Sequence, residues 1–123
     1  MARILMHPRI LLVEDQLLMQ QVELALLAKA GYKAEVAATG QEAFNKASMG
    51  GFDLILMDVC LPDIEGTEVT QRLRAKGINT PIVAMTGNDD EQTRAECRQA
   101  GMNGFLAKPM DSDQFRAVIE AYC

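Results

Sequence analysis

At 123 residues, 49% of them hydrophobic, the chain fits one domain that can bury a core without disulfide bonds. Its net charge of −5 argues against nucleic acid as a direct partner, because binding to phosphates requires a basic surface. The three cysteines form no CxxC pair and no apolar run reaches the length of a membrane span, so we expect a cytoplasmic domain with no direct membrane contact.

From residue 9 onward, short apolar runs alternate with longer helical patterns. The runs are rich in Ile, Leu and Val, as in strands that are buried on both faces of a sheet. Residues 1–8 precede the first run and are predicted to be a leader or linker segment, which leaves 9–123 as the domain. In chain order, the predicted elements are strand 10–13, helix 17–30, strand 33–37, helix 40–49, strand 54–57, helix 66–75, strand 82–85, helix 90–100, strand 104–107 and helix 111–122. Strands that alternate with helices indicate βα units, and therefore an α/β fold with a parallel sheet.

Polar residues follow four of the five predicted strands. In an open parallel sheet, ligands bind in the crevice beyond the carboxyl ends of the strands. Three carboxylates at one edge repel one another unless positive charge lies among them, and Mg²⁺ is the cation that suits carboxylates, waters and phosphate oxygens. A hydroxyl and an ammonium group suit the oxygens of a transferring phosphoryl group. The residues are Glu14 and Asp15 after the first strand, Asp58 after the third, Thr86 after the fourth and Lys108 after the fifth. The combination indicates acyl-phosphate chemistry on a carboxylate.

Between Arg9 and Tyr122 the chain resembles the receiver domain of two-component response regulators. The motifs that carry the resemblance are LLVED at 11–15, LILMD at 54–58, LPD at 61–63, Gly66, PIVAMTG at 81–87, AG at 100–101 and FLAKP at 105–109. The resemblance implies a flavodoxin-like (βα)5 doubly wound sandwich, with strand order 2-1-3-4-5 and helices on both faces.

The resemblance also implies a role for each matching site residue. Asp58 is implied as the phosphoacceptor. Glu14 and Asp15 are implied to hold Mg²⁺ together with Asp58 and the backbone carbonyl of Cys60. The first acid of the motif is Glu14, at a position where the family also has Asp. The longer glutamate side chain places this metal ligand farther from the backbone.

A second group of residues is implied to respond to the phosphoryl group. Thr86 and Lys108 would donate hydrogen bonds to the phosphoryl oxygens. Gly87 is small enough to let the phosphoryl group pass. Phe105 is implied to be the aromatic residue that changes rotamer as Thr86 moves. The Lys108–Pro109 bond is implied to be cis.

The predicted helix 17–30 has more apolar residues than one buried stripe needs. One set is predicted to face the sheet: Leu18, Val22, Ala25 and Leu26. The side chains of Leu17, Met19 and Leu24 are then predicted to point partly toward solvent. We expect Leu17 and Met19, beside the acidic pocket, to dock a helical bundle that bears the donor histidine; the alternative is ordinary apolar scatter on a surface.

These inferences predict a phosphoacceptor that receives its phosphoryl group from a histidine kinase or histidine phosphotransfer domain. We favour the receiver of a hybrid sensor histidine kinase, on the cytoplasmic side of the inner membrane, over a stand-alone regulator. The last helices are a candidate homodimer surface. A phosphohydrolase is the enzyme alternative, but it needs a second acid two residues after the nucleophile, where this chain has Cys60. A flavodoxin-like binding module is disfavoured because no Gly-rich loop follows the first strand.

Overall fold

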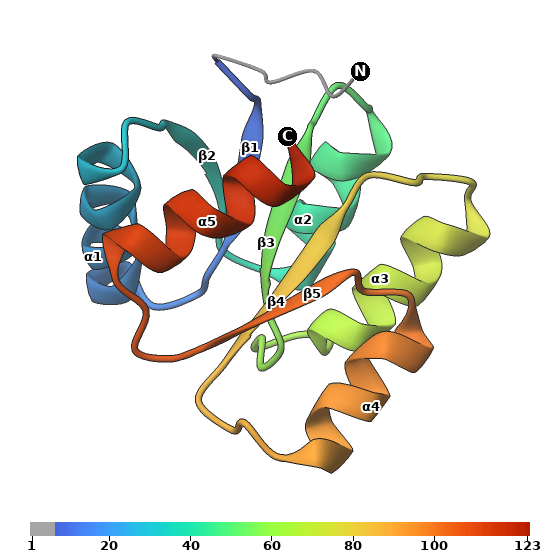
Figure 1. The fold of residues 1–123 in the computed structure, drawn as a ribbon. Coiled ribbons are helices and arrows are strands. Elements are labelled where there is room, and N and C mark those ends of the chain that lie inside the picture. Colours follow the sequence, from blue (N-terminus) through green and yellow to red (C-terminus); the bar gives the residue numbers. More distant parts are fainter. Residues whose placement is uncertain (1–6) are drawn as a thin grey trace.

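The computed structural model describes residues 7–123, and in this range five strands alternate with five helices (Figure 1). All strand pairs are parallel, and the order across the sheet is β2-β1-β3-β4-β5. The elements are β1 (Ile10–Val13), α1 (Leu17–Lys29), β2 (Ala34–Ala37), α2 (Gly40–Ser48), β3 (Leu54–Asp58), α3 (Gly66–Ala75), β4 (Ile82–Thr86), α4 (Glu91–Ala100), β5 (Gly104–Ala107) and α5 (Ser112–Tyr122). The predicted fold and strand order are confirmed. Of the leader predicted at 1–8, the first six residues lie outside the described range.

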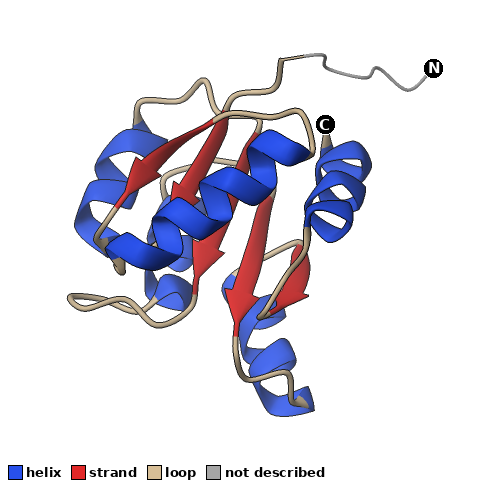
Figure 2. Ribbon diagram, turned by 90° about the vertical axis from the view of Figure 1, so that its left-hand side faces the viewer, coloured by secondary structure: helices blue, strands red, loops and turns tan. Residues whose placement is uncertain are grey.

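The sheet is the middle layer of a three-layer sandwich. Helices α1 and α5 cover one face, whereas α2, α3 and α4 cover the other (Figures 1 and 2). Every residue of β1, β3 and β4 is buried, and successive side chains enter opposite cores, as the period of a strand requires. Leu11 and Val13 join the core under α2 to α4, whereas Ile10 and Leu12 join the core under α1 and α5. The continuous apolar runs of the sequence reflect this two-sided burial.

Helix α1 is rotated relative to the face that we predicted from its sequence. Leu18 is 71% exposed and Val22 is 43% exposed, although both were expected to face the sheet. The fully buried side chains of the helix are Glu23 and Leu27. The prediction was wrong because apolar residues occur all round this helix, so their pattern cannot select a face. In addition, the buried face includes a glutamate, which a hydrophobic pattern assigns to the surface.

Arg74, near the end of α3, connects the loops at the amino ends of β4 and β5. Its guanidinium group donates hydrogen bonds to the backbone carbonyls of Ile78, Thr80 and Gly101 and to Asn103 Oδ1. The same Asn103 oxygen accepts the Ile82 N–H, at the start of β4. One half-buried side chain therefore fixes the loops that lead into two strands. Within residues 7–123, no helix is both long and apolar enough to cross a membrane.

Candidate functional site

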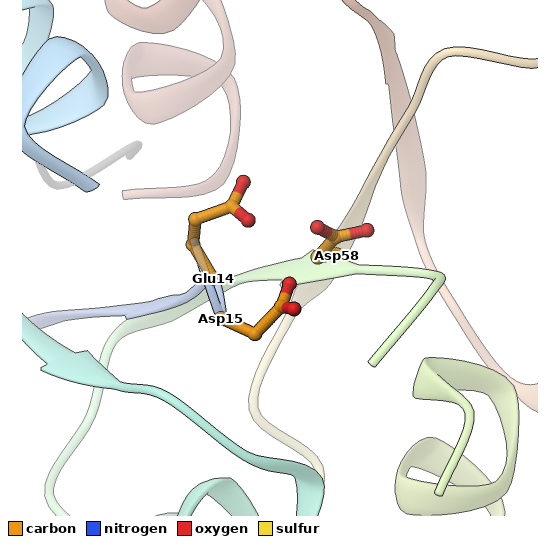
Figure 3. A group of neighbouring side chains, drawn as sticks. All are labelled: Glu14, Asp15 and Asp58. Carbon is orange, nitrogen blue, oxygen red and sulfur yellow. The ribbon is translucent and has the colours of Figure 1, made fainter. Parts of the chain in front are cut away.

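Three carboxyl groups meet beyond the carboxyl ends of β1 and β3. Glu14 and Asp15 directly follow β1, and Asp58 is the last residue of β3. One oxygen from each of the three lies within 4.8 Å of the others (Figure 3). Glu14 and Asp58 are buried, and Asp15 is half-buried. The sequence prediction that these three acids converge is therefore correct, and this is the donor set that a hard divalent cation prefers.

Lys108 brings a positive charge to the same place from the end of β5. Its Nζ atom donates hydrogen bonds to Glu14 Oε1 at 2.9 Å and to Asp58 Oδ2 at 3.1 Å. The peptide bond that follows, Lys108–Pro109, is cis, as the family resemblance implied.

The electrostatics of these groups follow from burial and from the shared lysine. Burial raises the pKa of Asp58 above its usual value, although the Cys60 N–H and the Lys108 ammonium act in the opposite direction. Burial also acts to raise the pKa of Glu14, but hydrogen bonds from Lys108 and Gln16 outweigh it and leave that pKa lowered. For Lys108, burial acts to lower the pKa, and the bonds and charges of Glu14 and Asp58 outweigh it and raise that pKa. A charged lysine and an ionised Glu14 therefore coexist at neutral pH.

Thr86 and Gly87 complete the rim of the hollow that contains the acids. The hollow has a volume of about 410 Å³, and its lining includes the three acids, Lys108, Thr86 and Gly87. Thr86 is 6% exposed, and its Oγ1 accepts the Asn88 N–H at 3.0 Å. An added Cβ on Gly87 would meet no atom within 4 Å, so the backbone here is open toward the hollow.

The loop that follows Asp58 is held in place by three contacts. The Cys60 N–H donates to Asp58 Oδ1 at 3.0 Å, which orients the carboxyl group. Asp63 accepts the N–H groups of Gly40 and Gln41 at the start of α2, at 2.8 and 2.9 Å. Gly66 packs so closely that a Cβ would overlap the Asp58 carbonyl oxygen. The Cys60 thiol is exposed and is not an acid, so the second acid that a phosphohydrolase needs is missing from this position.

Phe105 lies on β5, half-buried against the core of α2 to α4. The Arg94 guanidinium group of α4 lies 4.5 Å from the centre of its ring, and Arg94 is also paired with Asp89 at 2.6 Å. Sequence reasoning found Phe105 but missed this contact, since a pair between α4 and β5 becomes visible only when the two elements are packed together.

The two residues proposed for partner docking differ in their exposure. Leu17 is 69% exposed, whereas Met19 is half-buried. Leu18 and Val22 accompany Leu17 on the outside of α1. The outward apolar surface of α1 thus consists of Leu17, Leu18 and Val22. We call this surface the α1 patch.

Sequence reasoning missed one buried acid beside the site. Glu23 of α1 is 1% exposed, and neither of its carboxyl oxygens has a hydrogen-bond partner in the described part of the chain. No sequence signal could have located it, because apolar residues occur all round α1 and a hydrophobic pattern assigns a glutamate to the surface.

Comparisons with known sequences place the chain among two-component signalling proteins. It is 42% identical over 103 residues to the transcription factor prr1 of Schizosaccharomyces pombe, which covers 84% of this chain and 19% of prr1. It is 37% identical over 122 residues to the osmosensing histidine protein kinase SLN1 of Saccharomyces cerevisiae, which covers 94% of this chain and 10% of SLN1. The chain therefore spans a tenth to a fifth of the length of these relatives.

Comparisons with solved structures also place the chain among signalling proteins of this kind. The receiver domain of the sensor histidine kinase PA1611 from Pseudomonas aeruginosa PAO1 is 37% identical, with a TM-score of 0.86 over 94% of this chain and 97% of that one, and a magnesium ion is coordinated in its active-site cleft. The chemotaxis protein CheY4 of Vibrio cholerae is 29% identical, with a TM-score of 0.84 over 95% of this chain and 99% of that one. The profile of the response regulator receiver domain matches residues 10–120. The chain belongs to the response regulator receiver domain family.

Proposed function

We propose that this domain accepts a phosphoryl group on Asp58 in a two-component signalling pathway and then changes the shape of a surface to which partner proteins bind. The observation that carries the proposal is the position of Asp58. This buried carboxyl group lies at the end of β3, within 4.8 Å of two other acids and 3.1 Å from the Lys108 ammonium. Few other chemistries need a carboxylate nucleophile placed between acids and a lysine.

In the proposed reaction, an oxygen of Asp58 forms a bond to phosphorus while the bond from phosphorus to the donor imidazole nitrogen breaks, and the imidazole keeps that electron pair. Asp58 Oδ1 is oriented by the Cys60 N–H, and Oδ2 is held by Lys108. The Lys108 ammonium and the Thr86 hydroxyl are the hydrogen-bond donors available for the phosphoryl oxygens. The water-poor, buried position of Asp58 strengthens these interactions.

Mg²⁺ is the cofactor that fits the acids. Glu14, Asp15 and Asp58 would hold it, with the backbone carbonyl of Cys60 as a further ligand, and all of these residues line one hollow. When bound, the ion supplies the charge that lets an anionic phosphodonor approach three carboxylates. The magnesium in the cleft of the PA1611 receiver domain supports this proposal.

Switching would follow from Thr86 and Phe105. We infer that a phosphoryl group on Asp58 draws the Thr86 hydroxyl away from the Asn88 N–H that it now accepts. Such a shift changes the space beside β5, where Phe105 lies half-buried, and so biases the positions of α4 and β5. The last helices would then present a different surface, which includes the proposed homodimer contact.

We further propose that the domain is the receiver of a hybrid sensor histidine kinase, with a histidine kinase or a histidine phosphotransfer domain as its partner. The similarity to SLN1 and to the PA1611 receiver domain supports this context. The similarity to prr1 and CheY4 keeps a regulator outside a kinase as the alternative. In either context, the α1 patch beside the acids is the proposed docking surface for the helical bundle of the donor.

Labelling with a small phosphodonor tests the proposed function directly. The purified chain is incubated with acetyl phosphate and Mg²⁺, and its intact mass is compared with that of Asp58→Asn and of Asp113→Asn, an exposed aspartate of α5. We expect a gain of one phosphoryl group in the wild type and in Asp113→Asn, none in Asp58→Asn, and none after chelation of the metal. Labelling of Asp58→Asn, or an unlabelled wild type with every phosphodonor, would contradict the proposal.

A further inference from the structure

One arginine of α4 holds the loop that joins β4 to α4. The Arg94 Nε–H donates a hydrogen bond to Asp89 Oδ1, and Arg94 Nε and Nη2 both lie 2.6 Å from that oxygen. Asp89 belongs to the loop that follows Thr86, and it is not the cap of the helix. Asp90 is the N-cap, since its side chain accepts the Thr93 N–H. The pair between Asp89 and Arg94 therefore joins the loop to α4 independently of the cap.

The same guanidinium group lies over the ring of Phe105 on β5. It is 4.5 Å from the ring centre, which is within the range of a cation–π contact. The ring is half-buried against the core under α2 to α4. Phe105 and Arg94 also line a hollow of about 240 Å³, so space remains beside the ring. Arg94 therefore adds to what holds the ring in its present position. We call its contacts with Asp89 and Phe105 the Arg94 link.

The Arg94 link is weak, because its charged groups are exposed to water. The side chains of Arg94 and Asp89 are 44% and 45% exposed, so water and salt screen their attraction. Contacts of these two kinds at exposed sites shift an equilibrium by about two- to fivefold. Such an effect is too small to determine the fold, but it is sufficient to change the ratio between two conformations of one loop.

We propose that Arg94 is a positioning residue that holds the β4–α4 loop and the Phe105 ring in the unphosphorylated arrangement, and so slows phosphorylation of Asp58. Movement of Thr86 toward a phosphoryl group would draw the loop with it and separate Asp89 from Arg94. A change of rotamer would remove the Phe105 ring from Arg94. The Arg94 link thus opposes both movements.

The effect on Asp58 follows from the populations of the two arrangements. If the arrangement that accepts the phosphoryl group is the less populated one, any contact that stabilises the other lowers the apparent reactivity of Asp58. This switching part of the inference rests on the proposed function. The two contacts of Arg94 do not rest on it.

Four substitutions separate the Arg94 link from the charge of α4. Arg94→Gln removes both contacts. Asp89→Asn removes the ion pair, and Phe105→Leu removes the ring. Arg98→Gln, at an exposed position one turn further along α4, removes the same charge and is the control. Folding of each variant is checked by its thermal unfolding.

The first readout needs neither a metal nor a phosphodonor and reports on Arg94 itself. A proton near the face of an aromatic ring is shielded, and a hydrogen-bonded guanidinium N–H exchanges slowly with water. We expect the Nε–H of Arg94 to resonate apart from that of Arg98 and to exchange more slowly. In Asp89→Asn and in Phe105→Leu its resonance should move toward that of Arg98. If the two arginines are indistinguishable in the wild type, the proposal is overturned, whatever the result of phosphorylation.

The second readout is the rate of labelling by acetyl phosphate in the presence of Mg²⁺. We expect labelling to be about two- to fivefold faster in Arg94→Gln, and unchanged or slower in Arg98→Gln. The sign is decisive, because removal of a positive charge by itself slows the approach of an anionic donor. Arg94→Lys keeps the charge without the planar fork and should be labelled at an intermediate rate.

The two readouts also separate this inference from the proposed function. Labelling of folded Arg94→Gln at the wild-type rate or more slowly would overturn the switching part. A wild type that acetyl phosphate leaves unlabelled would instead contradict the proposed function. The Nε–H resonance would still decide whether Arg94 holds the loop and the ring.

Discussion

Glu14 and Lys108 are 94 residues apart in sequence, and their side chains meet at 2.9 Å beyond the carboxyl ends of β1 and β5. The same ammonium lies 3.1 Å from Asp58 Oδ2. One lysine therefore serves two acids that no other described cation pairs with. This arrangement gives Lys108 two separable effects, since it offsets the charge of the acids and can bond an incoming phosphoryl oxygen.

Replacement of Lys108 by Met should slow phosphorylation without abolishing metal binding. The variant removes a donor for the developing charge, for which losses of about 100-fold are typical. It also frees Glu14 and Asp58 from a competing cation, so Mg²⁺ affinity is expected to stay the same or to rise. The measurements are the acetyl-phosphate labelling rate and calorimetric Mg²⁺ titration, with exposed Lys33→Met as the control. A variant that is labelled at the wild-type rate would contradict this role of Lys108.

The cap of α2 by Asp63 should make stability depend on pH in the acidic range. The N–H groups of Gln41 and Gly40 hold the pKa of Asp63 below its ordinary value. A lowered pKa in the folded state means that the contribution of Asp63 is present above the pKa of the unfolded chain, about 4, and is lost as the pH falls through the folded value. We expect Asp63→Asn to lower the urea midpoint at pH 7 and to differ less from the wild type at pH 3. A difference that is constant or larger at pH 3 would contradict the prediction, and Glu120→Gln is the matched control.

Two glycines near the site should respond differently to the same substitution. A Cβ on Gly66 would overlap the Asp58 carbonyl oxygen and would approach the Val59 Cα, and both are backbone atoms that cannot swing aside as a side chain can. Gly66→Ala should lower the free energy of unfolding by about 1–3 kcal/mol, as overpacked positions do. Gly87→Ala meets no atom within 4 Å and should change it by less than about 0.5 kcal/mol. Urea denaturation of both variants tests the contrast, which would be refuted by equal losses.

The α1 patch should matter for transfer from a protein donor but not from a small molecule. Leu17 and Leu18 are 69% and 71% exposed, so replacing both with Asp leaves the core intact while it disrupts an apolar contact. We expect transfer from a phosphorylated histidine phosphotransfer domain to fall at least about tenfold, with labelling by acetyl phosphate unchanged. Met49→Asp, at an 87% exposed position just after α2, is the control. Equal loss in both assays would show that the patch acts on the reaction and not on docking.

The arrangement of the site could be predicted from the sequence because its residues lie at or just after the ends of predicted strands. Asp58 and Thr86 end their strands, and Lys108 follows the last strand, so a correct reading of the strands was sufficient to bring them together. Side chains within α1 could not be placed in this way. Its apolar residues surround the helix, and its buried face includes Glu23, which no hydrophobic pattern anticipates.

Contacts between loops were also beyond sequence reasoning. Asp63 caps a helix that begins 23 residues before it, and Arg74 bonds a carbonyl 27 residues after it. Such bonds depend on the distance between two turns after the sheet has formed, and neither residue carries a local signal of its partner. The sequence therefore locates functional residues that stand at the ends of strands. It does not locate contacts that depend on how the elements pack together.

The bonds made by Arg74 have a mechanical consequence for the whole domain. They hold the entrances of β4 and β5 to the ends of α3 and α4, at the rim farthest from Asp58. The proposed switch starts at the opposite ends of these strands, where Thr86 and Lys108 line the same hollow as Asp58. We therefore expect displacements that start beside Asp58 to leave the Arg74 end of the sheet in place and to move the α4 and β5 surface instead.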